Sequence, residues 1–182
     1  PDDFDTFWDK QVAAVEVPQD YQLLEKDFQI AYATCYELTF KSGSGGQIYA
    51  KLVVPKLSEK VPVLFHFHGY MGQGWDWADM LAYTAAGWGV VSMDVRGQSG
   101  YSLDGNREVR GNTVKGHIIR GALDGPDQLF FKDVYLDVYT LVELVAGLDF
   151  VDENCLSSFG GSQGGALALV AAALNSRIKQ TV

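Results

Sequence analysis

The chain has 182 residues, of which 47% are hydrophobic and 20% are charged, and its net charge is −9. This length allows one sizeable core, and the acidity argues against a nucleic-acid partner, because phosphate binding needs a basic surface. No apolar run approaches the roughly 20 residues of a membrane span. The acidic start at Pro1 also lacks the layout of a signal peptide.

The two cysteines, Cys35 and Cys155, fall in predicted strands that lie far apart in the sequence. This usage is typical of reduced, buried thiols in a cytoplasmic protein rather than of a disulfide or a metal pair. We therefore expect a cytoplasmic protein without a metal site.

The first third of the chain predicts a helix followed by an antiparallel hairpin. Apolar residues recur at helical spacing over residues 3–16, which indicates an amphipathic helix on the outside of the core. Residues 28–40 and 48–54 alternate between apolar and polar side chains, which is typical of half-buried strands. The glycine-rich segment 42–46 is predicted to be the turn that joins them.

The pattern changes after Lys60, where apolar runs become continuous. Runs of this kind indicate strands that are covered on both faces. The expected elements alternate between strand and helix: strands 61–67, 89–95 and 156–159, and helices 77–87, 132–147 and 163–175. Such alternation predicts one α/β domain over 1–182, with a mostly parallel sheet and helices on both faces.

Residues 99–131 show no sustained periodicity. A long irregular segment inside a compact domain is usually functional or disordered. Its apolar and aromatic side chains argue against disorder, so we expect an ordered insertion that runs beside the site.

The segment that follows strand 156–159 carries the clearest chemical signal. Gly160, Ser162 and Gly164 form the G-x-S-x-G pattern of a nucleophile elbow. A serine on a sharp strand-to-helix turn is held in strained backbone geometry, and glycines two residues away on either side avoid a collision with the neighbouring backbone. The following helix directs its positive end at the same point, so the N–H of Gln163 is a candidate oxyanion donor.

A second donor is expected from the loop after strand 61–67, which reads His68-Gly69-Tyr70. In an α/β hydrolase this loop supplies the other oxyanion N–H, and Tyr70 is the best candidate. We interpret His66 as a hydrogen-bonded core residue and His68 as a structural residue of the loop.

Arg96, Gly97 and Gln98 come directly after strand 89–95. An arginine fixed at the end of a strand could bind an acidic group, or could hold a neighbouring loop by hydrogen bonds to carbonyls. From residue chemistry alone we favour the structural role.

Taken together, the motifs Arg96-Gly97-Gln98, Gly160-Gly161-Ser162-Gln163-Gly164 and His68-Gly69-Tyr70 resemble the acetyl xylan esterase and cephalosporin C deacetylase family, carbohydrate esterase family 7. Residues 116–121 and the acidic helix near Asp133 and Asp137 resemble it too. The resemblance covers nearly the whole chain.

The resemblance implies an α/β-hydrolase fold, a Ser-His-Asp triad and removal of acetyl groups from small acetylated sugars and similar esters. It also implies no cofactor, a cytoplasmic location and a homo-hexamer. Carried over by position, Ser162 is the nucleophile, the backbone N–H groups of Tyr70 and Gln163 form the oxyanion hole, and Arg96 and Gln98 brace the site.

The triad is not complete in this sequence. The fold places the acid and then the histidine after the serine, but the residues after Ser162 include no His, Asp or Glu, and His117 in the insertion is a poor candidate for the base. We expect residues 1–182 to be the amino-terminal part of a longer protein, truncated after the nucleophile helix and inactive alone. Two rival hypotheses remain: a serine peptidase or other acyl hydrolase of the same fold, and a non-catalytic relative that binds ligands or partners.

Overall fold

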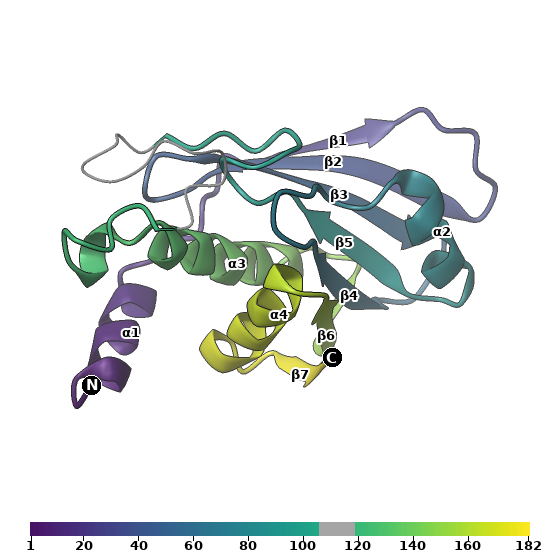
Figure 1. The fold of residues 1–182 in the computed structure, drawn as a ribbon. Helices are drawn as coiled ribbons and strands as arrows, with labels where there is room; N and C mark the ends of the chain where they lie inside the picture. Colours follow the sequence, from purple (N-terminus) through teal and green to yellow (C-terminus); the bar gives the residue numbers. More distant parts are fainter. Residues whose placement is uncertain (106–118) are drawn as a thin grey trace.

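The computed structural model describes residues 1–105 and 119–182, and within them seven strands form one sheet (Figure 1). The strands are β1 Gln22–Lys26, β2 Ala33–Lys41, β3 Gln47–Pro55, β4 Val61–Phe67, β5 Gly89–Met93, β6 Val151–Gly160 and β7 Ile178–Thr181. The helices are α1 Phe4–Ala13, α2 Trp77–Ala85, α3 Phe130–Ala146, α4 Gln163–Leu174 and a short 3₁₀ helix, Pro126–Gln128.

The sheet is mixed, with the strand order β1-β2-β3-β5-β4-β6-β7. Three neighbouring pairs, β1–β2, β2–β3 and β3–β5, are antiparallel, and three, β4–β5, β4–β6 and β6–β7, are parallel. We expected a mostly parallel sheet with one hairpin, but the sheet has as many antiparallel pairs as parallel ones. One reason is that β1 adds a third strand to the hairpin.

The chain crosses from one side of β4 to the other between β5 and β6. A reversal of strand order of this kind opens a crevice at the carboxyl ends of the strands, where ligands bind in open α/β sheets. The carboxyl ends of β4 and β6 lie side by side here, since Phe67 pairs with Gly160. The fold therefore brings the loop after β4 to the turn after β6.

Both faces of the sheet are covered, as predicted. Alternate residues of β3 and β5 serve different cores: Leu52 and Val91 pack in the larger core with α3 and α4, whereas Val53 and Val90 pack with Met80 of α2. Figure 1 shows α3 and α4 below the sheet and α2 beside its other face. Helix α1 has no fully buried residue and contacts α3 through an aromatic pair, Trp8 and Tyr135, with ring centroids 5.6 Å apart.

Several details differ from the sequence-based expectations. The strand expected from residue 28 begins at Ala33, and β6 begins five residues before the expected strand, at Val151. Cys35 is buried as predicted, but the prediction for Cys155 was wrong: it is exposed, because it lies in the exposed stretch 153–155 of β6, where the pairing register with β4 shifts. Of the expected insertion 99–131, residues 106–118 lie outside the described residues.

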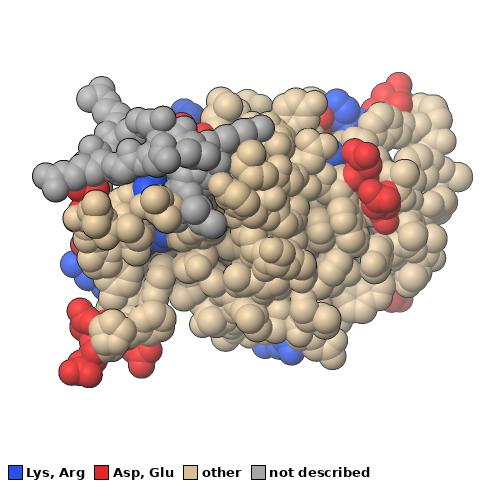
Figure 2. Space-filling view, viewed as in Figure 1, with Lys and Arg blue, Asp and Glu red and all other residues tan. Residues whose placement is uncertain are grey.

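The described residues include no helix that is both long and apolar enough to cross a membrane. On the face drawn in Figure 2, acidic side chains gather at the lower left, where Figure 1 places α1, and most of the remaining surface is uncharged.

Candidate active site

Ser162 lies in the short turn between β6 and α4 and has the backbone geometry that the motif predicts. Its φ of 56° and ψ of −122° are unusual for a residue with a side chain, and Ser162 is exposed. Such conformations cost on the order of 1–3 kcal/mol and persist where the surrounding structure fixes them. The strained turn leaves Ser162 exposed directly after the carboxyl end of β6.

The two flanking glycines are required by close backbone contacts. A Cβ atom on Gly164 would lie 1.9 Å from the carbonyl oxygen of Phe67, and one on Gly160 would lie 2.4 Å from the carbonyl carbon of Gly164. Helix α4 thus begins directly against the last residue of β4. The collision expected from the motif spacing is confirmed, and no side chain larger than hydrogen fits at either position without a backbone shift.

The loop after β4 lies beside this turn. A Cβ atom built on Gly69 would be 3.7 Å from the carbonyl oxygen of Gly161 and 3.9 Å from Cβ of Ser162. Tyr70 follows directly, with 40% of its surface exposed. Gln163 is the first residue of α4 on the other side of Ser162, so its N–H has no acceptor within the helix. The structure therefore places both predicted oxyanion donors in segments that adjoin Ser162, and their role stays a prediction.

Gln98 connects these two segments. Its side-chain Oε1 accepts a hydrogen bond from the Met71 N–H at 2.8 Å, and its Nε2 donates to Oε1 of Gln163 at 2.7 Å. The side-chain Nε2 of Gln163 donates back to Oε1 of Gln98 at 3.1 Å. Met71 has a φ of 63°, so Gln98 holds a strained residue that directly follows Tyr70. Gln98 thus joins the loop after β4 to the first residue of α4, and its bracing role in catalysis stays a prediction.

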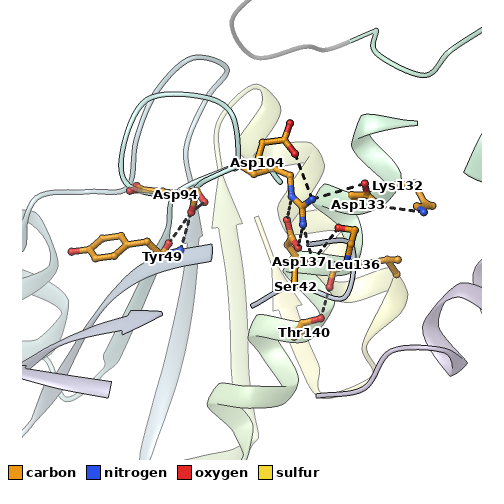
Figure 3. Close-up of polar contacts among 12 residues, drawn as sticks. Ser42, Tyr49, Asp94, Asp104, Lys132, Asp133, Leu136, Asp137 and Thr140 are labelled. Atoms are coloured by element: carbon orange, nitrogen blue, oxygen red, sulfur yellow. Dashed lines mark hydrogen bonds and ion pairs between the residues drawn. The ribbon is translucent and has the colours of Figure 1, made fainter. Parts of the chain in front are cut away.

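The Arg96 guanidinium contacts α3 and the turn between β2 and β3. It is fully buried, and its Nε and Nη2 donate to the two carboxylate oxygens of Asp137 at 2.6 Å each. Figure 3 shows Asp104, Asp133 and Ser42 around the same guanidinium, with Ser42 Oγ accepting at 2.7 Å.

Arg96 thus ties α3 to the β2–β3 turn and to the start of the insertion. Burial alone would lower the pKa of Arg96, but Asp137 and the other carboxylates outweigh burial and raise that pKa above its ordinary value. The predicted structural role is consistent with this geometry, although the partners are acidic side chains rather than carbonyls, because α3 brings its carboxylates within reach.

The two described histidines have structural contacts. His68 Nδ1 donates to the Gly69 carbonyl at 2.8 Å, and its Nε2 accepts from the Val95 N–H at 2.9 Å, which occupies both ring nitrogens. His66 Nδ1 lies 2.8 Å from Ser92 Oγ, and its ring stacks on Trp75 at 4.0 Å. Burial lowers the pKa of both residues, that of His66 to about 4. His117 lies outside the described residues.

Asp94 and Ser92 were not predicted from the sequence, and both hold the loop after β4. Asp94 Oδ1 accepts the Gly74 N–H at 2.6 Å, and Ser92 Oγ accepts the Trp75 N–H at 2.8 Å. The available signal was their position, because polar residues at the end of a buried strand lie where a ligand crevice opens. Among residues 1–105 and 119–182, no group of three or more His, Cys, Asp or Glu side chains could hold a metal ion.

Comparison with known proteins identifies the family. The model of the acetyl xylan esterase family AXE1 matches residues 1–182. The chain belongs to this family. The acetyl esterase Axe7A of Xylanibacter ruminicola is 29% identical over 189 aligned residues, which cover 100% of this chain and 43% of the relative.

Solved structures of the acetyl xylan esterase family agree with the described fold. Acetyl xylan esterase 1 from Thermoanaerobacterium sp. JW/SL YS485 superposes with a TM-score of 0.92 at 42% identity, over 100% of this chain and 57% of the relative. The acetyl xylan esterase from Paenibacillus sp. R4 gives 0.91 at 32% identity, over 100% and 58%.

The α/β hydrolase GrgF from Penicillium sp. sh18 shares the fold alone, with a TM-score of 0.59 at 17% identity over 81% of this chain and 44% of its own. The predicted α/β-hydrolase fold and family are thus confirmed. This acetyl xylan esterase family chain spans less than two thirds of the length of the relatives that it matches.

Proposed function

We propose that the protein is a serine carboxylesterase that removes acetyl groups from small acetylated sugars, such as xylo-oligosaccharides, and from related esters such as cephalosporin C. The observation that carries the proposal is Ser162, exposed and strained at a glycine-rich turn beside Gly69, in a chain of the acetyl xylan esterase family. The names of the relatives Axe7A and acetyl xylan esterase 1 support acetyl esters as the substrate class.

In this mechanism Ser162 Oγ attacks the acetyl carbonyl carbon, and a general base takes the hydroxyl proton. The backbone N–H groups of Tyr70 and Gln163 donate to the carbonyl oxygen as it gains negative charge. Collapse of the tetrahedral intermediate breaks the C–O bond, the sugar alcohol leaves with the proton, and acetyl-Ser162 remains. Water then attacks this ester, with the same base removing its proton, and acetate leaves as Ser162 Oγ is protonated again.

The base and its acid belong to the proposal. His68 has both ring nitrogens engaged, and the relatives are longer than this chain. The order of the fold is serine, acid, histidine, so we place the triad Asp and His after Val182. The proposed chemistry needs no cofactor. A cytoplasmic location and a homo-hexamer, without nucleic-acid or membrane partners, complete the proposal.

The test measures acetate release from acetylated xylo-oligosaccharides by the full-length protein and by Ser162→Ala. We expect release to fall by a factor of about 10³ or more in the variant, since only binding and the oxyanion hole remain. Ser176→Ala, an exposed serine directly before the amino end of β7, is the matched control and should keep full activity, because β7 runs parallel to β6 and Ser162 follows the carboxyl end of β6.

A fluorophosphonate probe gives a second measurement, because it labels an activated serine whatever the natural substrate. Labelling that disappears in Ser162→Ala supports the nucleophile. Faster cleavage of peptides than of acetyl esters would favour a serine peptidase instead. Absence of both labelling and acetate release in the wild-type protein would favour a non-catalytic relative.

A further inference from the structure

The loop of residues 69–75, which contains Tyr70, is held mainly by side chains from β5 and the turn that follows it. The Met71 N–H donates to Gln98 at 2.8 Å, and the Met71 carbonyl accepts from Ser99 Oγ at 2.9 Å. Further along the loop, the Gly74 N–H donates to Asp94 at 2.6 Å. The position of Tyr70 therefore depends on the neighbouring strand as well as on its own.

The end of the loop is held in the same way. The Trp75 N–H donates to Ser92 Oγ at 2.8 Å, and the Trp75 carbonyl accepts from Lys51 Nζ at 2.8 Å. Ser92 belongs to β5 and Lys51 to β3. Side chains from neighbouring strands and turns therefore hold the loop backbone at three separate residues, Met71, Gly74 and Trp75.

Among the side chains that hold the loop, Asp94 is the one whose two carboxylate oxygens accept N–H groups from two different segments. It is 3% exposed, and while Oδ1 accepts the Gly74 N–H, Oδ2 accepts the Tyr101 N–H at 2.7 Å. The turn closes around the carboxylate, since a Cβ atom on Gly100 would lie 2.2 Å from Oδ2. In the described part of the chain, no Lys or Arg side chain forms an ion pair with Asp94.

The backbone of Asp94 is fixed as firmly as its side chain. Its N–H donates to the Tyr49 carbonyl at 3.0 Å (Figure 3), and its carbonyl accepts from Ser102 Oγ at 2.6 Å. Two N–H groups from different segments thus bond to the two oxygens of one carboxylate, whose backbone is itself hydrogen-bonded on both sides. Only a group with an acceptor oxygen on each side satisfies both donors.

We propose that Asp94 is a positioning residue for ester hydrolysis: its carboxylate joins the loop of residues 69–75 to the turn of residues 97–101 and so sets the direction of the Tyr70 N–H toward the substrate oxyanion. The inference rests on the proposed function. Asp94 does not touch the substrate in this scheme, and it acts through the loop backbone.

Asp94→Asn is the sharpest perturbation because it keeps the shape and replaces one acceptor oxygen with an NH₂ group. One of the two backbone N–H groups then faces another donor, and the loop or the turn must move. A displacement of about 1 Å at a reacting group can cost about 10²-fold in rate, and loss of one oxyanion donor costs about 10²–10³-fold. We expect kcat to fall by about ten- to a hundredfold with KM changed by less than about threefold.

The experiment uses the full-length protein and expresses kcat per serine titrated with the fluorophosphonate probe, so that unfolded molecules do not count. Affinity for a trifluoromethyl ketone, which forms a tetrahedral hemiketal with Ser162 Oγ and so carries an oxyanion on its former carbonyl oxygen, should fall in parallel with kcat. Glu143→Gln is the control, because this carboxylate also accepts two hydrogen bonds, from the side chains of Asn175 and Arg177, but next to the amino end of β7 rather than at the carboxyl ends of the strands where Ser162 lies. It should leave kcat per titrated serine unchanged.

Unchanged kcat and unchanged ketone affinity in Asp94→Asn would overturn the inference while leaving the proposed function intact. If Asp94→Asn does not fold, Ser99→Ala decides, since it removes the donor to the Met71 carbonyl. A three- to tenfold fall in kcat, about the size expected for partial release of the loop, supports positioning through the loop, and no fall overturns it. A wild-type protein that neither labels nor hydrolyses would overturn the proposed function and this inference with it.

Discussion

Replacing Gly164 with alanine gives a direct test of how the elbow is built. A new Cβ at this position would lie 1.9 Å from the Phe67 carbonyl oxygen and 3.0 Å from that of His68, and real Cβ atoms essentially never approach closer than 3.0 Å. Helix α4 and the end of β4 must therefore separate by about 3.0 − 1.9 = 1.1 Å. Both sides of the contact are backbone, so no side chain can rotate to relieve it.

We expect Gly164→Ala to lower the free energy of unfolding, although helix propensity alone would raise it. Gly164 lies within α4, where alanine alone would stabilise the helix by about 1 kcal/mol. Overpacking typically costs about 1–3 kcal/mol and occasionally more. Because Phe67 is paired on both sides in the middle of the sheet, relaxation is restricted, and we expect a net loss of at least about 2 kcal/mol in the free energy of unfolding.

Urea unfolding of the full-length protein, followed by tryptophan fluorescence, measures this loss. Gly161→Ala is the control in the same turn, since a Cβ there would meet nothing within 4 Å. Gly165→Ala is the control for helix propensity, with a nearest contact of 3.2 Å to the Gly160 carbonyl oxygen. We expect both controls to stay within about 1 kcal/mol of the wild-type protein. Wild-type stability in Gly164→Ala would refute the close approach of α4 to β4.

Three further predictions concern buried polar groups and thiols. Asp137→Ala leaves the buried Arg96 guanidinium without its two shortest hydrogen bonds, and we expect a loss of about 3–5 kcal/mol in urea unfolding; a loss below about 1 kcal/mol would contradict the buried pair. The pKa of His66, which burial and then His68 lower to about 4, means that the folded state binds fewer protons than the unfolded state. Its contribution to stability is therefore complete above about pH 6.5 and declines as the pH falls toward 4, and an NMR titration of the His66 ring that gave a pKa above 6 would rule this out. Exposed Cys155 should react with a thiol reagent in the folded protein, whereas Cys35, which is 1% exposed and has a pKa raised by burial, should react only on unfolding; rapid labelling of the Cys35 peptide in the folded protein would be the contrary result.

The parts of the fold that could be predicted are those with local signals. The continuous apolar runs of β4 and β5 and the helical spacing of α3 reflect burial of those elements on one or both faces. The turn around Ser162 was predictable for a different reason, since Gly160 and Gly164 are needed at fixed spacing whatever lies around them.

The strands that were missed carry little apolar signal. In β1, Gln22–Lys26, every residue is exposed or half-buried, and in β7, Ile178–Thr181, only Ile178 is buried. The first half of β6 contains exposed residues 153–155. These segments are strands because neighbouring backbone offers hydrogen bonds, and side-chain periodicity does not record that.

The two parts of the candidate site also differ in how well the sequence predicts them, because they are held in place by different interactions. The elbow at Ser162 is fixed by backbone against backbone, at Gly164 and Phe67, so a motif of three residues identifies it. The loop with Tyr70 is fixed by polar side chains from another strand, among them Asp94 and Gln98.

Such partners appear only when the reversal of strand order places β5 beside β4. It follows that the elbow should be sensitive to added volume and tolerant of changes in polarity around it. The loop with Tyr70 should show the reverse, responding to the loss of single acceptor oxygens that leave the size of the side chain unchanged.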